Sequence, residues 1–181
     1  SLFVRSPGPT RRRPVTPMTR TVPMALVMCL AFTALGAEPS NEITAANVLR
    51  LMNDYRADEG LPPLHSDERL DLAAADRMHE MEEGAYWSHH SLRGDSPFLW
   101  LYRRAYDYRA AGENLAYGFE TARLLVQSWM ESRGHRANIL SSEYEDCGIA
   151  IIDGSTLGPA SGKSIVVMFG KSAPPVAVSK K

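Results

Sequence analysis

This sequence contains very little cysteine. Its 181 residues include only Cys29 and Cys147, and Cys29 lies in an apolar leader that we expect to be removed. The remaining domain would then hold one cysteine and no internal disulfide, so its hydrophobic core alone must stabilise it. Cys147 stands in the apolar, strand-like run CGIAIID, which predicts a buried small hydrophobe rather than a reactive thiol.

Positive charge is scarce in the body of the chain. Five arginines and no acid precede Glu38, so residues 38–181 carry 15 of the 20 basic side chains, all 21 acidic ones and a net charge of −6. An acidic body argues against nucleic acid as a partner, because phosphate backbones require a basic face. The length and the 44% hydrophobic content suffice for one domain with a core, but not for two large ones.

Long hydrophobic runs are also missing. The apolar run Val22–Leu35 is too short for a stable membrane span. It follows Arg20 and precedes small residues, which is the anatomy of a secretory signal peptide. We therefore predict an upstream overhang over 1–17, a signal peptide over 18–37, a linker over 38–42 and a secreted or periplasmic protein. An uncleaved anchor is the alternative.

Several familiar catalytic motifs are absent from the sequence. It contains no G-x-S-x-G nucleophile elbow, no phosphate loop and no dinucleotide-binding fingerprint. The stretch HEMEE at His79 lacks the second histidine of a zinc-protease helix. No activated nucleophile is therefore evident.

The pattern of apolar residues predicts helices first and strands last. Helical stripes and capping residues place helices at Thr44–Asp58, from Asp67 to Gly84, after Asp95 or Ser96, and from Thr121 to near Gly134. The runs CGIAIID and KSIVVMFG predict strands, AAGENLAYG predicts a loop or short extended piece, and residues 172–181 predict a flexible tail. This order favours an α+β fold, with helices packed on an antiparallel sheet.

Five polar residues stand in stretches that are dense in aromatics, glycines and helix ends: His89, His90, Glu113, Glu131 and His135. Such stretches fix backbone geometry. Two imidazoles with one or two carboxylates suit a divalent transition metal or a proton-transferring set. The alternative is a buried His–Glu pair that only ties a loop to a helix.

The stretches GENLAYG, VQSWMESRGHRANIL and CGIAI follow WSHHSLRGDSPF and the opening stretch MNDYRADEGLPPL. This set resembles the CAP superfamily, which comprises cysteine-rich secretory proteins, venom antigens and plant pathogenesis-related proteins. The compact, disulfide-free bacterial branch is the most similar. The resemblance covers residues 43–171 and implies a three-layer α-β-α sandwich with a central antiparallel sheet.

The resemblance also implies a central cleft with two histidines and two acids. By position in the motifs, His89 and His135 match the histidines and Glu113 matches the first acid. These three residues would be the ligands of zinc or another divalent cation. The second acid falls on Ser132, which leaves the neighbouring Glu131 as a substitute in the cleft.

The ligand and the activity stay open at this point. The resemblance implies a divalent metal and, in some members, lipid or sterol, so we expect a small-molecule, lipid or envelope ligand. A metal-assisted extracellular hydrolase with Glu113 as base, and a structural or interaction module with a vestigial cleft, are the alternatives. The family has no agreed catalytic activity, so we expect a binding protein more than an enzyme, of open oligomeric state. Gly134 is expected to end its helix and so to direct His135 into the cleft.

Overall fold

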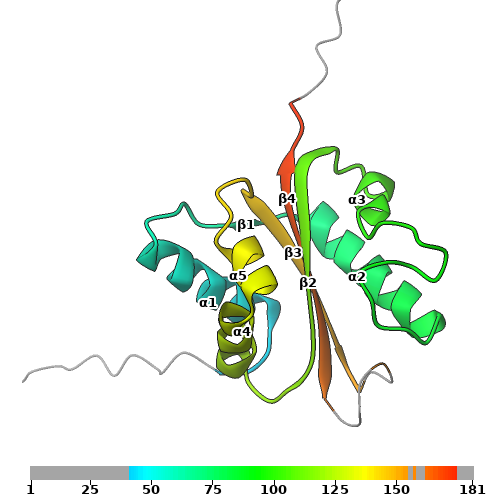
Figure 1. Cartoon of the computed structure of the whole chain (residues 1–181), viewed down its shortest axis with the longest axis horizontal. Helices are drawn as coiled ribbons and strands as arrows, with labels where there is room; N and C mark the ends of the chain where they lie inside the picture. The colour runs from blue at the N-terminus through cyan, green and yellow to red at the C-terminus, as the bar shows by residue number, and fades with distance from the viewer. Residues whose placement is uncertain (1–40, 155–156, 158–161, 175–181) are drawn as a thin grey trace, which may run out of the picture. The chain divides into compact units, whose positions relative to one another are not determined.

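The computed structural model describes residues 41–154, 157 and 162–174 (Figure 1). The predicted overhang and signal peptide, most of the linker and the end of the tail lie outside these residues. None of the helices in this part of the chain combines the length and the apolar character that a bilayer crossing requires. In chain order the elements are α1 (Ala45–Asp58), β1 (His65–Ser66), α2 (Glu68–Glu83), α3 (Leu99–Arg103), β2 (Tyr108–Phe119), α4 (Ala122–Glu131), α5 (Arg133–Ile139), β3 (Asp146–Asp153) and β4 (Lys163–Ser172).

Three helices begin where the sequence predicts, because each has a side chain that accepts a backbone N–H of its first turn. Thr44, Asp67 and Thr121 are the three caps, of α1, α2 and α4. Such a cap satisfies one of the four N–H groups that a helix leaves without an internal partner. The starts of these helices are therefore fixed locally, before any tertiary contact is considered.

The helix around Gly134 differs from the prediction. The expected helix stops at Glu131, Ser132 has extended backbone angles, and a second helix, α5, starts at Arg133. Gly134 and His135 therefore lie in the first turn of α5, instead of at the end of a longer helix. The direction of His135 is set by the break at Ser132.

The four strands form one sheet in the order β1-β3-β4-β2. β4 pairs antiparallel with both β2 and β3, and the two-residue β1 adds a short parallel pairing to β3. AAGENLAYG, for which a loop or short extended piece was predicted, lies entirely within β2 and pairs with β4. The α+β class is thus confirmed, with a mixed sheet in which antiparallel pairing dominates.

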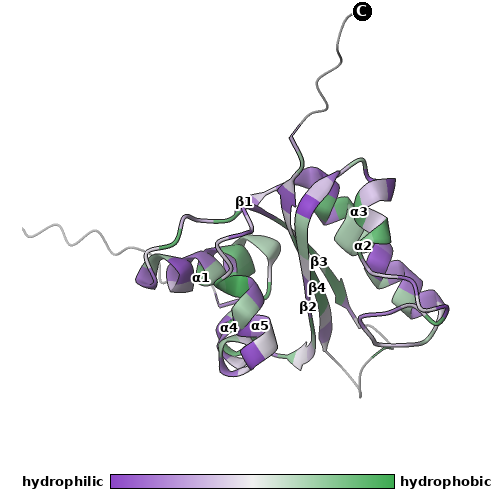
Figure 2. Ribbon diagram, turned by 45° about the horizontal axis from the view of Figure 1, so that its top comes forward, coloured by the Kyte–Doolittle hydropathy of each residue, from purple (hydrophilic) through white to green (hydrophobic). Residues whose placement is uncertain are grey.

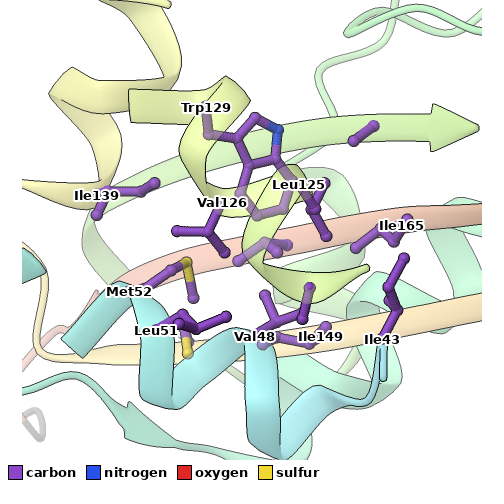
Figure 3. Packing of buried hydrophobic residues seen from close by; sticks show 14 of the residues in the cluster. Ile43, Val48, Leu51, Met52, Leu125, Val126, Trp129, Ile139, Ile149 and Ile165 are labelled. Atoms are coloured by element: carbon purple, nitrogen blue, oxygen red, sulfur yellow. The ribbon is translucent and has the colours of Figure 1, made fainter. Parts of the chain in front are cut away.

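Helices cover both faces of the sheet, which makes three layers (Figure 1). Residues of α1, α4 and α5 form one core cluster with the sheet, and residues of α2 and α3 form the other. Figure 3 shows the first cluster, in which Trp129 and Val126 from α4 face Met52 from α1. Figure 2 shows hydrophilic and hydrophobic residues alternating along α1 and α2, as expected for helices with one buried face.

The layer formed by α2 and α3 packs closely on the sheet at Gly148. A Cβ atom at this residue would lie 2.0 Å from the backbone carbon of Leu70 in α2, so only glycine allows this approach. The neighbouring Cys147 is buried, and burial raises the pKa of its thiol to about 12. Its predicted role as a buried hydrophobe is therefore confirmed.

The outer edge of β2 is covered by side chains instead of another strand. Three alternate carbonyl groups of β2 each accept a hydrogen bond from a side chain of α4, α5 or the segment that follows α5. This keeps polar backbone groups satisfied at the sheet edge. The three bonds run from Tyr144 Oη to Ala111 O (3.0 Å), from Asn138 Nδ2 to Glu113 O (3.0 Å) and from Trp129 Nε1 to Leu115 O (3.3 Å).

Candidate functional site

A cleft of about 490 Å³ lies over this edge of β2. β2 supplies its floor, the segment before α3 supplies one side and α5 supplies the other. His89, Glu113 and His135, which the sequence predicts for one site, all line it. The full lining is His89, His90, Ser96, Pro97, Phe98, Ala111, Gly112, Glu113, Ser132, Gly134, His135, Asn138 and Tyr144.

Gly112 is required by the way this floor is built. A Cβ atom there would lie 2.6 Å from the hydroxyl oxygen of Tyr144, which crosses Gly112 to reach the carbonyl of Ala111. The glycine of the GEN stretch therefore leaves room for the ring that covers the sheet edge, directly beside Glu113.

Glu113 is the centre of the site. Only 5% of the residue is exposed, and its two carboxylate oxygens have different partners. Oε1 lies 2.7 Å from Nδ1 of His89, and Oε2 accepts a hydrogen bond of 3.2 Å from Nε of Arg77. A buried carboxylate is costly unless it is paired and hydrogen-bonded, and here both conditions are met.

Arg77 is fully buried and donates to the Glu113 oxygen that does not face His89. Besides Glu113, its guanidinium donates to Glu80 Oε2 at 2.7 Å, to the Tyr86 hydroxyl at 2.6 Å and to the carbonyl of Ser88. Burial alone would lower the pKa of Arg77, but attraction to Glu113 and the bonds to Tyr86 and Glu80 outweigh it and raise the pKa. The guanidinium is therefore a fixed cation beneath the cleft.

The two cleft histidines differ in their electrostatics. The hydrogen bond to Glu113 raises the pKa of His89 above its ordinary value, whereas burial and repulsion from His89 lower the pKa of His135. Because Nδ1 of His89 faces Glu113, Nε2 is the nitrogen left for a ligand. The side chain of His89 lines the cleft and is 53% exposed, so the imidazole is accessible from solvent.

Glu131, also predicted for the cleft, lies outside it. Its side chain is on the exposed surface of α4 and accepts a hydrogen bond of 3.3 Å from Gln127. Ser132, the residue at the position of the expected second acid, lines the cleft instead. Glu131 is the last residue of α4, whereas Ser132 forms the break between α4 and α5.

Arg77 is the site residue that sequence reasoning missed. It stands on the buried stripe of α2 with Leu70, Ala74 and Met81, at helical spacing. A lone arginine on an otherwise apolar stripe is the signal that would have found it, because a buried guanidinium requires a paired acid.

The predicted three-ligand metal set does not fit this geometry. Each oxygen of Glu113 already faces His89 or Arg77, so only imidazole nitrogens are left as donors. Within the described residues, no three His, Cys, Asp or Glu side chains are placed so that they could hold an ion. Catalytic zinc sites take three ligands from the protein. Zinc binding itself stays a prediction.

Among known families, the chain matches the one described as "Cysteine-rich secretory protein family" (CAP), over residues 49–167. Among curated proteins, the chain is 33% identical over 130 residues to "Uncharacterized protein YkwD" of Bacillus subtilis. The aligned region covers 67% of this chain and 51% of that protein. It is 33% identical over 104 residues to "Uncharacterized membrane protein YlbC" of the same organism, covering 58% and 30%. The chain thus spans about half or less of the length of these relatives.

Two solved structures share the fold. An extracellular protein of Bacillus anthracis that contains an SCP domain superposes with a TM-score of 0.61 at 24% identity, over 74% of this chain and 45% of that one. An outer surface protein of Borrelia burgdorferi superposes with a TM-score of 0.61 at 20% identity, over 73% and 98%. At these identities the likeness shows the arrangement of helices and strands alone.

Proposed function

Because the chain belongs to the CAP family of cysteine-rich secretory proteins, we propose that it is an exported binding protein whose cleft holds a polar group of an extracellular or envelope molecule. Two structural neighbours are described as an extracellular protein and an outer surface protein, which supports export. The leader-like start of the sequence supports the same location.

One observation carries the proposal, the line of contacts from Arg77 through Glu113 to His89. Replacing a buried ion pair by apolar residues is often neutral or stabilising, so such a pair is weak evidence for a purely structural role. This line ends on an exposed imidazole in a cleft, and a simple tie between loop and helix does not require that exposure. This exposure supports a ligand-binding role for the imidazole of His89.

The test is a nuclear magnetic resonance titration of the purified protein with zinc chloride, acetate, phosphate, acetamide and N-acetylglucosamine. Wild type is compared with His89→Ala and His135→Ala, and His79→Ala is the matched control because His79 is an exposed histidine on α2, away from the cleft. We expect at least one probe to shift cleft signals in wild type and in the control, and to lose this effect in both cleft variants. Equal responses in all four proteins would rule the cleft out as the binding site.

A further inference from the structure

The cleft has one apolar patch among polar groups. Pro97 and Phe98, from the segment before α3, form this patch, and His89, His90 and Ser96 of the same segment lie beside it. Ser132, His135 and Asn138, from α5 in the opposite layer and the break before it, add polar groups on the other side of the cleft. A ligand in this cleft therefore meets an apolar surface at Phe98 and hydrogen-bonding groups around it.

The apolar patch at Phe98 continues beyond the cleft lining as a strip of three aromatic rings, those of Phe98, Tyr108 and Tyr102. The ring of Phe98 meets Tyr108 edge-on, with centroids 5.8 Å apart, and Tyr108 packs against Tyr102 at 4.9 Å. Tyr102 is 54% exposed although it is a large hydrophobic residue. Rings that pack on one another in this way are held in place, so the strip presents a fixed apolar surface that leads out of the cleft.

The buried charges beneath the cleft are bonded to one another. Arg77 and Glu113 are both buried and form an ion pair, and Glu80 is a second carboxylate bonded to Arg77. A strongly charged ligand therefore gains little from this pair, and orientation depends on the imidazole, hydroxyl and amide groups of the cleft. The ligand that matches is neutral, with one apolar face and many hydroxyl or amide groups.

A sugar ring has this division of chemistry. Its faces carry C–H bonds that pack on aromatic rings, and its edge carries hydroxyl groups that hydrogen-bond. We infer that the cleft takes a neutral sugar chain, with one ring on Phe98 and its hydroxyl groups facing His89 and His135. The next sugar lies along Tyr102. The inference rests on the proposed function, because it names the ligand class of the same cleft.

Calorimetric titration with chitotetraose (the N-acetylglucosamine tetramer) and cellotetraose tests the inference. We expect wild type to bind at least one of them. Phe98→Ala is expected to weaken binding about tenfold or more, and Tyr102→Ala about threefold to tenfold, because each removes one stacking surface. Tyr117→Ala is the matched control: Tyr117 is an exposed aromatic residue that does not line the cleft, and its loss should leave binding unchanged.

Tyr102→Ala keeps the test valid if Phe98→Ala does not fold, since Tyr102 is largely exposed. Binding of chitotetraose alone would show that the site recognises the acetamido group. Binding of both probes would show that it recognises the sugar ring itself. No binding of either sugar, or binding that Tyr102→Ala leaves intact, would overturn the inference. If other probes still need His89 and His135 in that case, the proposed function survives; if sugar binds without these histidines, the cleft is not its site.

Discussion

Two buried arginines, one in each helical layer, have opposite surroundings. Arg56 in α1 donates to four backbone carbonyl groups, those of Pro62, Ile139, Ser141 and Tyr144. Arg77 in α2 donates to the carboxylates of Glu80 and Glu113. Burial lowers the pKa of Arg56, whereas the acids around Arg77 outweigh burial and raise its pKa.

This difference separates a structural use of arginine from a functional one. Arg56 joins the chain after α1 to the segment after α5, and neutral carbonyls suffice for that. Arg77 has a negatively charged partner that continues to an exposed histidine in the cleft. The nature of the acceptors, more than the degree of burial, indicates which arginine belongs to a site.

The largest effect that tests this comparison is expected for Arg77→Met. Removing the guanidinium leaves Glu113 as an uncompensated buried charge, so we expect a loss of about 3–5 kcal/mol in the free energy of unfolding, measured by urea denaturation. Adding Glu113→Gln should recover a substantial part of this loss, because the charge is then gone. A double variant as unstable as the single one would show that charge pairing is not the reason.

Arg56→Met should also destabilise the protein, by about 2–4 kcal/mol, because buried carbonyls lose charged donors. In contrast to Arg77→Met, this substitution leaves no carboxylate without its partner, because all four acceptors of Arg56 are backbone carbonyls. Replacing a nearby Asp or Glu as well should therefore not restore stability. Urea denaturation measures the loss, and the cleft signals of His89 should keep their wild-type positions in the folded fraction. A shift of those signals would place Arg56 in the site after all.

A smaller effect concerns the pH dependence of the two histidines. The pKa of His89 is raised above 6.5, so its contribution to stability is present in full below 6.5 and is lost as the pH rises through the folded-state pKa. The pKa of His135 is lowered, so the protein gains stability as the pH rises from the folded value of His135 towards 6.5. Ring-proton titrations should give the higher pKa to His89, and Glu113→Gln should abolish that order. Equal titration midpoints in wild type would contradict the geometry.

The smallest effect is expected for Glu131→Ala, within about 0.5 kcal/mol, because an exposed side chain with one long hydrogen bond contributes little. Binding of cleft probes should not change. Ser132→Ala, one residue further on, removes a hydroxyl group from the cleft lining and should weaken the same probes. A reversed result for these neighbours would move the cleft boundary to α4.

The sequence predicted those parts of the fold that local chemistry determines. Caps at Thr44, Asp67 and Thr121 marked the helix starts, and the apolar runs marked β3 and β4. β2 was predicted only as a loop or a short extended piece, because its Gly, Glu and Asn residues disfavour strands locally, and pairing with β4 makes the segment a long strand. Tertiary context overrode propensity at this point.

The candidate site was predictable to a similar degree. Motif positions brought His89, Glu113 and His135 together, as the cleft shows. Two features depend on side-chain geometry that spacing does not contain. One is the direction of Glu131, which lies on the exposed surface of α4 outside the cleft, and the other is the contact of Arg77 with Glu113.

The side-chain donors along β2 also bear on behaviour at high concentration. An uncovered edge strand offers a template on which copies of a protein join their sheets and form fibres. In β2, three of the edge carbonyl groups already accept hydrogen bonds from the side chains of Tyr144, Asn138 and Trp129. With no disulfide in the described residues, the fold depends on non-covalent protection of this kind. The side chains that cover this edge thus leave fewer backbone groups for a neighbouring molecule to pair with.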